Sequence, residues 1–345
     1  MTATLFSHKE RTDVSPAAHI VSTGTALPGD PVDNEAIARR FGTDTDWVEA
    51  FIGTRQRHFA VDLNTGQVTH TLTDLGAQAC AQAMAGAGLE PQDVDFLVLG
   101  TSSPDALMPA TVNLIADRLG IDQVATYQLQ SGCAGALQAL DLACRLLDEE
   151  HLIGLVVGAD VCVKHLVLDR DASSVRPSGR VLSGDGAGAA VLASELVPGS
   201  IAVRRVLNRF SGLGQAPGQV VRWFGAADLA DPRQPVEEDH KAIAERVPLL
   251  ARQAMKEILG MTGWHPASMS YLLPPQLPGR VARLVTKELS LTDVTEISSI
   301  AHLGNAVPFF QFDLLRDRIL AEQRAVAIAI EPSKWIRAAV TLEGV

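Results

Sequence analysis

Cys133 is the residue of this chain best placed to act as a nucleophile. It follows a strand-like run at 124–130 and the pair Ser131-Gly132, and an alanine-rich stretch typical of a helix begins directly at the cysteine. Backbone N–H groups at the start of a helix favour a negative charge, so they would stabilise a thiolate. The alternative is a small buried cysteine at a strand-to-helix turn. The local sequence leaves both interpretations open.

The composition predicts a globular protein without a metal site. The chain has 345 residues, of which 47% are hydrophobic, enough for one large domain or two of ordinary size. Its four cysteines, Cys80, Cys133, Cys144 and Cys162, are spaced neither as a disulfide framework nor as metal ligands, and the histidines show no metal-ligand spacing. We read the other three cysteines as core thiols.

Charge and hydropathy restrict the partners. The net charge of −11 argues against general affinity for nucleic acid, and an acidic partner would need a local basic patch. We find no signal-peptide pattern and no uncharged run approaching the ~20 residues that span a bilayer. We therefore expect a cytoplasmic protein that binds neither nucleic acid nor membrane.

The pattern of elements is repeated along the chain. Apolar strand-like runs alternate with amphipathic helices, which favours an α/β sandwich. A predicted helix is followed by Pro91 and a strand from Phe96, and a second one by Pro266 and a strand from Tyr271, at the same spacing from proline to aromatic residue. Two duplicated halves are the simplest explanation.

The repeat sets the expected domain organisation. We predict an N-terminal half at 1–195 and a C-terminal half at 196–345, with an irregular cap or loop region at about 208–239 that shapes the acceptor side. In this arrangement Cys133 and Asn305 occupy equivalent turns. They would therefore meet at a shared cleft.

Three motifs identify a family resemblance. They are Gly-Thr-Ala-Leu-Pro at 24–28, Gly-Asp-Gly-Ala-Gly-Ala at 184–189, and Gly304-Asn305. With the repeat, they resemble the thiolase superfamily over nearly the whole chain, most closely its β-ketoacyl-acyl-carrier-protein synthase III branch. The resemblance implies a layered α-β-α-β-α sandwich. It also implies that Cys133 takes an acyl group from a thioester, and that Asn305 and a histidine stabilise the enolate formed when a malonyl thioester loses carbon dioxide.

Two prolines depart from the family pattern. Pro275 stands where the family has that histidine, and Pro332 aligns with the glycine whose N–H completes the oxyanion hole. Proline can neither transfer a proton nor donate a backbone hydrogen bond. Loss of an oxyanion donor costs about 10²–10³ in rate, and loss of a general acid or base about 10²–10⁴. Decarboxylating condensation should therefore be badly impaired.

His302 is the best candidate to replace the missing histidine. It lies three residues before Asn305, on the segment that leads into the expected cleft. A neutral imidazole there could deprotonate an incoming thiol or hydroxyl. The sequence on balance favours the alternative, a histidine that points away from the cleft and bonds a loop carbonyl.

Carrier recognition can be predicted from one helix and from the resemblance. Arg280, Arg283 and Lys287 share one face of a helix, which suits an acidic helix or a phosphate, although a solvated helix face fits too. By resemblance, Arg280 docks the acyl carrier protein and Trp47 stacks on the adenine of coenzyme A.

The resemblance also implies a quaternary arrangement. Met108 matches a position that crosses a homodimer interface to line the partner's acyl pocket, and methionine there is adaptable. We expect no bound cofactor, only the acyl-phosphopantetheine of a carrier protein, or acyl-coenzyme A, as a substrate.

Three functions remain open from the sequence. The one we favour is an acyltransferase of natural-product biosynthesis that passes an acyl or aryl group from a carrier protein, through Cys133, to a thiol, hydroxyl or amine. The second is a decarboxylating β-ketoacyl synthase III. The third is a catalytically silent partner subunit of a condensing enzyme.

Overall fold

The protein is built from two similar series of strands and helices. The structure is a computed structural model that describes residues 18–42, 44–165, 183–222, 236–277, 279–289, 291, 294–298 and 301–345. The first series comprises β1 (Ala18–Ala26), α3 (Leu72–Ala87), β4 (Phe96–Thr101), α4 (Thr111–Leu119), β5 (Ala125–Gln130), α5 (Gly135–Leu146), β6 (Ile153–Asp160) and β7 (Gly186–Ala193). The second comprises β8 (Ile201–Phe210), α6 (His240–Thr262), β11 (Tyr271–Leu273), α7 (Gly279–Leu289), β12 (Thr295–Glu296), α8 (Val307–Arg316), β13 (Arg324–Glu331) and β14 (Ile336–Gly344).

Strand pairing follows the same pattern in both series. The strand order is β5-β4-β6-β7-β1, followed by β8-β14-β13-β11-β12. Counted outward from the centre of the sheet, the strands of the second series therefore follow the same order as those of the first. In each, the β4-type strand pairs in parallel with both neighbours, whereas the last strand is antiparallel. The predicted duplication agrees with this topology, and the predicted boundary at 195/196 falls in the link between β7 and β8.

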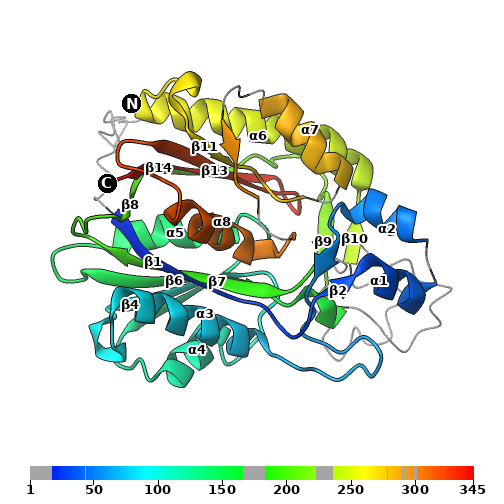
Figure 1. The fold of residues 1–345 in the computed structure, drawn as a ribbon, viewed down its shortest axis with the longest axis horizontal. Coiled ribbons are helices and arrows are strands. Elements are labelled where there is room, and N and C mark those ends of the chain that lie inside the picture. Colours follow the sequence, from blue (N-terminus) through cyan, green and yellow to red (C-terminus); the bar gives the residue numbers. More distant parts are fainter. Residues whose placement is uncertain are drawn as a thin grey trace, which may run out of the picture.

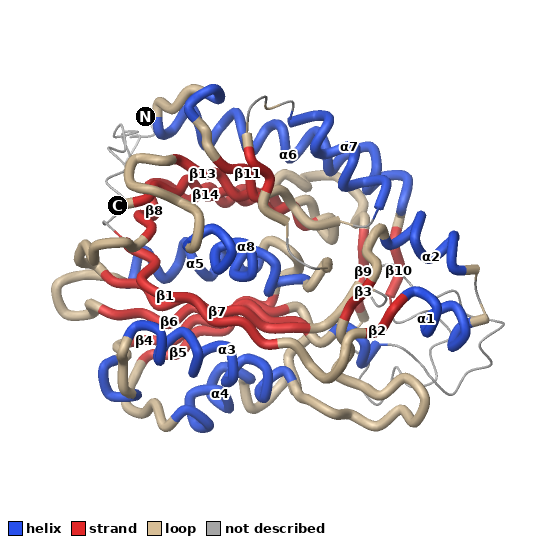
Figure 2. The backbone as a smooth tube through the Cα atoms, in the orientation of Figure 1, coloured by secondary structure: helices blue, strands red, loops and turns tan. Residues whose placement is uncertain are grey.

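The elements stack in five layers (Figures 1 and 2). Helices α3 and α4 cover the outer face of the first half-sheet, and α6 and α7 cover that of the second. Helices α5 and α8 lie between the two half-sheets, where they share one apolar cluster with residues of both. The predicted α/β fold, a layered α-β-α-β-α sandwich, is confirmed.

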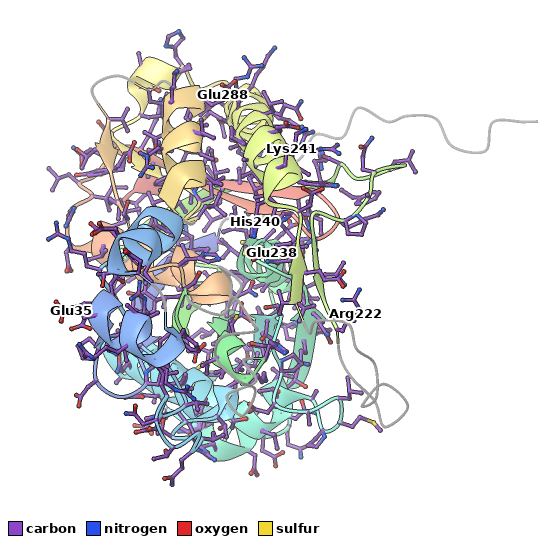
Figure 3. All side chains as sticks on the ribbon, turned by 90° about the vertical axis from the view of Figure 1, so that its right-hand side faces the viewer. Glu35, Arg222, Glu238, His240, Lys241 and Glu288 are labelled. Atoms are coloured by element: carbon purple, nitrogen blue, oxygen red, sulfur yellow. The ribbon has the colours of Figure 1, made fainter. Side chains whose placement is uncertain are left out.

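Smaller elements lie at one end of the layers. These are β2 (Val32–Asp33), α1 (Asn34–Phe41), α2 (Thr45–Ile52), β3 (Gln56–Arg57), β9 (Gln219–Val221), β10 (Val236–Glu238) and the 3-10 turns η2 (Cys162–His165) and η5 (Gly304–Ala306), whereas the 3-10 turns η1 (Pro91–Asp93) and η4 (Pro266–Ser268) precede β4 and β11 at the opposite end. Figure 3 views the molecule from this end, with Arg222 and Glu238 at the antiparallel β9–β10 pair. That pair lies within the predicted cap, of which residues 223–235 lie outside the described part.

Two glycines allow α8 to pack closely against the first half-sheet. A side chain at Gly158 of β6 would lie 2.1 Å from the backbone oxygen of Asn305, and one at Gly188 of β7 would lie 2.6 Å from Phe309. Since these contacts leave no room for a Cβ atom, glycine at both positions lets the start of α8 approach the sheet. Asn305 is thereby brought next to the turn that carries Cys133.

No helix in the described ranges combines the length and the apolar character needed to cross a membrane.

Candidate active site

Cys133 lies in the turn between β5 and α5. Helix α5 begins at Gly135, with Ala134 at its N-cap, so the prediction of a helix that starts at the cysteine itself is wrong by two residues. The reason is a tight turn, closed by the Gly135 N–H, which donates to the Gly132 carbonyl at 2.7 Å. Cys133 is half-buried in this turn, just before the positive end of the helix dipole.

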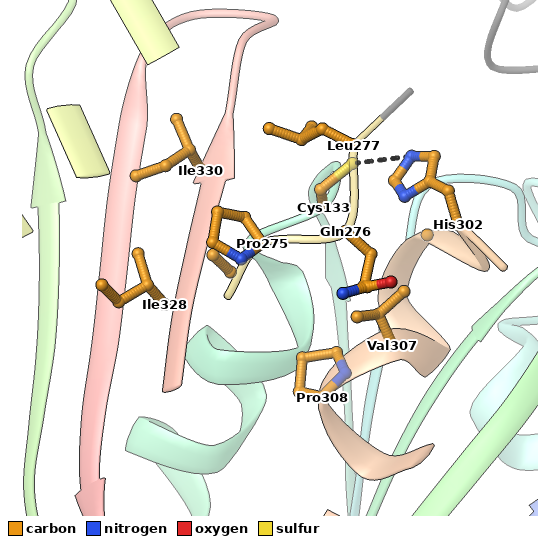
Figure 4. A pocket seen from close by; sticks show the side chains of 11 residues that line it. Cys133, Pro275, Gln276, Leu277, His302, Val307, Pro308, Ile328 and Ile330 are labelled. Carbon is orange, nitrogen blue, oxygen red and sulfur yellow. Dashed lines mark hydrogen bonds between the residues drawn. The ribbon is translucent and has the colours of Figure 1, made fainter. Parts of the chain in front are cut away.

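His302 points toward Cys133. Its Nε2 lies 3.7 Å from the Cys133 Sγ, across 169 positions of sequence (Figure 4). The alternative orientation, away from the cleft, is therefore wrong. An imidazole at this separation can take the thiol proton, and the resulting imidazolium favours the thiolate. The roles of nucleophile for Cys133 and base for His302 stay predictions, which this geometry suits.

Cys133 and His302 line a pocket whose walls are mostly apolar. The pocket is partly open to solvent. Besides Cys133 and His302, it is lined by Pro275, Gln276, Leu277, Gly304, Val307, Pro308, Ile328, Ala329 and Ile330. Pro275 thus presents an apolar ring at the position where the family resemblance places a histidine.

Asn305 is fully buried and fastens the turn around Cys133. Its Nδ2 donates to the Ser131 carbonyl at 3.2 Å and to Asp160 Oδ2 at 2.9 Å, while its Oδ1 accepts from the Ala136 N–H at 2.8 Å. Both amide hydrogens are therefore used within the protein. The predicted contact of Asn305 with a substrate enolate stays a prediction, and the observed bonds give it a positioning role.

Asp160 supports Asn305 from the end of β6. This fully buried carboxylate accepts from the Ser102 N–H at 2.8 Å, and from the hydroxyls of Ser102 at 2.6 Å and Ser103 at 2.9 Å. Its Oδ2 also accepts from the backbone N–H of Asn305 at 2.9 Å. Asp160 was not among the predicted site residues. Its signal was an acidic residue ending an otherwise apolar strand.

The β13–β14 turn brings Glu331 and Pro332 to the same region. Both residues are buried, and Pro332 has no N–H to offer to an oxyanion. Glu331 Oε1 accepts from the Ser333 N–H at 2.7 Å. Glu331 was not predicted as a candidate from the sequence, where its only signal is a carboxylate at the end of an apolar strand, directly before a proline.

The predicted carrier-binding residues lie on helices at one end of the molecule. Arg283 and Lys287 are exposed on α7, one helical turn apart. Helix α7 lies beside α2, which carries Trp47 (Figure 1). The side chains of Trp47 and Arg280 lie outside the described part of the chain. Met108, between β4 and α4, is 87% exposed. The roles of these residues stay predictions.

The other cysteines are unlike Cys133. Cys80, Cys144 and Cys162 are buried free thiols. Burial raises the pKa of Cys144 to about 12 and raises the pKa of Cys80 further. Since the thiolate is the reactive form, burial makes Cys80 and Cys144 unreactive at neutral pH.

Comparisons with known proteins identify the family. A family model described as 3-oxoacyl-[acyl-carrier-protein (ACP)] synthase III matches residues 127–205, which include the Cys133 turn. The β-ketoacyl-[acyl-carrier-protein] synthase III 5 of Streptomyces coelicolor is 31% identical over 305 residues, covering 85% of each chain. The chain belongs to the β-ketoacyl-acyl-carrier-protein synthase III family. It is an enzyme of the ketoacyl synthase III type, as the motifs predicted.

Two solved structures place it within this family. The first, "AbyA1 - tetronic acid condensing enzyme", has a TM-score of 0.89 and 44% identity, covering 95% of this chain and 100% of its own. The second, the synthase III of Pseudomonas aeruginosa PAO1, has a TM-score of 0.79 and 26% identity, covering 95% and 98%. The similarity to a natural-product enzyme is the higher of the two.

Proposed function

We propose that this enzyme is an acyltransferase that loads Cys133 from an acyl-carrier-protein thioester and passes the acyl group to a second substrate. The observation that carries the proposal is the 3.7 Å approach of His302 Nε2 to Cys133 Sγ. In the first step His302 takes the thiol proton, and the thiolate attacks the thioester carbonyl. The C–S bond to the carrier then breaks, and the carrier thiolate receives the proton from His302.

The groups that would drive decarboxylation are altered. Pro275 cannot donate a hydrogen bond to an enolate, and Pro332 offers no N–H. The two amide hydrogens of Asn305 are already engaged by Ser131 and Asp160. These observations favour acyl transfer to an acceptor that does not need to lose carbon dioxide to become a nucleophile. They count against the alternative of a decarboxylating synthase. The retained Cys133–His302 pair speaks against a silent subunit.

The likeness to a tetronic acid condensing enzyme suggests what the acceptor is. Tetronic acid is a five-membered lactone that contains one carbon nucleophile, one acyl carbon attached to it, and an oxygen on the next carbon. Disconnecting the ester bond and the bond between the carbon nucleophile and the acyl carbon gives an α-hydroxyacyl group and a thioester with an acidic C–H. A 3-oxoacyl thioester has such a C–H, because its enolate is shared between two carbonyl groups. We therefore add a carbon nucleophile of this kind to the thiol, hydroxyl and amine acceptors expected from the sequence.

Helix α7 suits a carrier-protein donor. The chain carries a net charge of −11, which would repel an acidic carrier, but the exposed Arg283 and Lys287 offer local positive charge. Their helix lies beside α2, where Trp47 is proposed to contact phosphopantetheine or coenzyme A. The donor we propose is the phosphopantetheine thioester of a carrier protein.

A homodimer is part of the proposal. Strand β5 forms one edge of the sheet, and its residues are only partly buried. The exposed Met108 follows β4, the strand paired with β5. An edge that pairs with no further strand in the described ranges, and that has an apolar side chain nearby, suits pairing with a second copy.

Intact mass analysis tests the loading step. The wild-type enzyme, incubated with a panel of acyl-carrier-protein thioesters, should gain the mass of one acyl group. The Cys133→Ala variant should gain none, because Cys80, Cys144 and Cys162 are buried. The absence of an adduct with every donor, together with slow alkylation of Cys133 by iodoacetamide, would remove the proposed activity.

A further inference from the structure

Glu331 is a buried carboxylate next to the nucleophile. It is the last residue of β13, directly after the pocket-lining residues Ile328 to Ile330, and only 1% of its surface is exposed. A charged side chain is rarely buried to this degree unless it is paired with a partner. No ion pair to Glu331 occurs among the described residues. Its environment therefore needs a functional explanation.

Only one oxygen of this carboxylate is satisfied within the described structure. Oε1 accepts the 2.7 Å hydrogen bond from the Ser333 N–H, whereas Oε2 is buried and meets no donor among the described residues. Buried oxygens of this kind nearly always have a partner in folded proteins. A donor that arrives with a substrate would supply one.

The unsatisfied oxygen faces the residue before Cys133. A Cβ atom built on Gly132 would lie 1.7 Å from Glu331 Oε2, so the carboxylate rests against the Gly132 backbone. The next residue of the turn, Pro332, brings no N–H to this side of the site. Where the family resemblance predicts hydrogen-bond donors for an oxyanion, this chain thus presents an acceptor.

We infer that Glu331 is a specificity-determining residue that accepts a hydrogen bond from a hydroxyl on the α-carbon of the acyl group held by Cys133. This inference rests on the proposed function and names its substrate class, an α-hydroxyacyl thioester. The α-carbon is bonded to the carbonyl carbon attached to Sγ, which keeps its substituents near residues 132 and 133. A hydroxyl there is the substrate donor closest to Oε2.

The same carboxylate discriminates against plain acyl groups. Without a hydroxyl, Oε2 remains unpaired beside a carbonyl that develops negative charge during transfer. Sites built to bond a substrate hydroxyl reject analogues without it, because their buried polar groups are then left without a partner. The preference for α-hydroxyacyl donors should therefore be at least about tenfold.

Loading rates of two matched thioesters test the inference. We would follow the Cys133 adduct by intact mass with lactyl-pantetheine and propionyl-pantetheine, which differ by one hydroxyl. The wild type should load lactyl at least about 10-fold faster. Glu331→Gln should lose most of this preference through slower lactyl loading, with propionyl loading no slower than in the wild type. Glu149→Gln, an exposed glutamate in the loop after α5, should keep the wild-type ratio.

The outcomes separate the two proposals. Equal rates for both thioesters in the wild type would overturn the role of Glu331 while leaving the acyltransferase intact, and this comparison needs no variant. If Glu331→Gln slowed lactyl and propionyl loading equally, Glu331 would have only a structural role, and this result would also overturn its proposed role in specificity. No adduct from either thioester, or from a carrier protein, removes the proposed function and the inference with it.

Discussion

At the scale of single residues, the proposed chemistry depends on a pair supplied by two distant parts of the chain. Cys133 comes from the turn before α5 and His302 from the segment before η5, yet Nε2 and Sγ lie 3.7 Å apart. The family histidine position is occupied by Pro275, which lines the same pocket. His302 is thus the base that we propose in place of the family histidine.

Replacing His302 should slow the reaction of Cys133 with iodoacetamide. His302→Ala removes the proton acceptor and the imidazolium that favours the thiolate, so we expect a loss of at least about tenfold at pH 7. The pH at which the rate reaches half its maximum should rise. Alkylation mapped by peptide mass measures both, and His151→Ala, which changes a histidine paired with Asp148 at the opposite end of α5, is the control. Unchanged rates in His302→Ala would exclude it as the base.

The sequence predicted these residues unequally. Cys133 stood out because its neighbours, a strand-like run followed by glycine and alanine, restrict where a nucleophile can sit. The direction of His302 could not be predicted, since it lies in a loop without periodicity and its partner is 169 positions away. Glu331 was missed because one charged residue after an apolar strand usually marks only the end of that strand.

At the scale of elements, the turn between β5 and α5 is held from three sides. Asn305 binds it at Ser131 and Ala136, the Gly135 N–H closes it, and Glu331 packs on Gly132. Such a network fixes Cys133 without using the side chain of Cys133 itself. The precise setting of a nucleophile by surrounding groups is what covalent catalysis requires.

A methyl group at Gly132 should disturb this turn. In Gly132→Ala the Cβ atom would lie 1.7 Å from the Glu331 carboxylate, which is buried and accepts a hydrogen bond from the Ser333 N–H. We expect a loss of about 1–3 kcal/mol in the free energy of unfolding, measured in urea, and slower Cys133 alkylation.

Helix α6 offers the matched control. A Cβ atom at Gly260 meets no atom within 4 Å, so Gly260→Ala should raise stability by up to about 1 kcal/mol and leave alkylation unchanged. If Gly132→Ala were as stable and as reactive as the wild type, the contact with Glu331 would have no part in holding the turn.

The repeat of elements was predictable, whereas the start of α5 was not. A helix, a proline and an aromatic residue recur at the same spacing in the two halves. In each half the proline begins a 3-10 turn, and a strand follows that begins at Phe96 or at Tyr271. The start of α5 was placed two residues early because alanine and glycine give no capping signal. The hydrogen bond from the Gly135 N–H to the Gly132 carbonyl closes a turn before the helix, which therefore begins at Gly135. The sequence does not show such a backbone bond.

At the scale of the whole molecule, duplication explains why the site lies where it does. Helices α5 and α8 are equivalent elements of the two series, and both lie in the central layer between the half-sheets. Their starting turns carry Cys133 and Asn305. The fold class followed from the alternation of strands and helices, but which groups of the second half reach Cys133 depends on loop conformations that a pattern does not determine.

Charge reversal on α7 should impair loading from a carrier protein. Arg283→Glu replaces an exposed cation on a strongly acidic molecule, so we expect loading from acyl-carrier protein to slow about tenfold at low salt. Loading from acyl-pantetheine should stay unchanged. Arg145→Glu, in the last turn of α5 and therefore far from Cys133, is the control. Equal effects on both donors would place carrier docking elsewhere.

The fate of the acyl group on Cys133 tests the central claim most directly. Enzyme loaded with an α-hydroxyacyl group would be divided between a 3-oxoacyl thioester and carboxyl-labelled malonyl carrier protein, with the loss of the Cys133 adduct and the release of labelled carbon dioxide both measured. We expect the 3-oxoacyl thioester to consume the adduct, and malonyl carrier protein to yield no carbon dioxide above a Cys133→Ala blank. Carbon dioxide released in proportion to adduct lost would contradict this claim and identify a decarboxylating synthase.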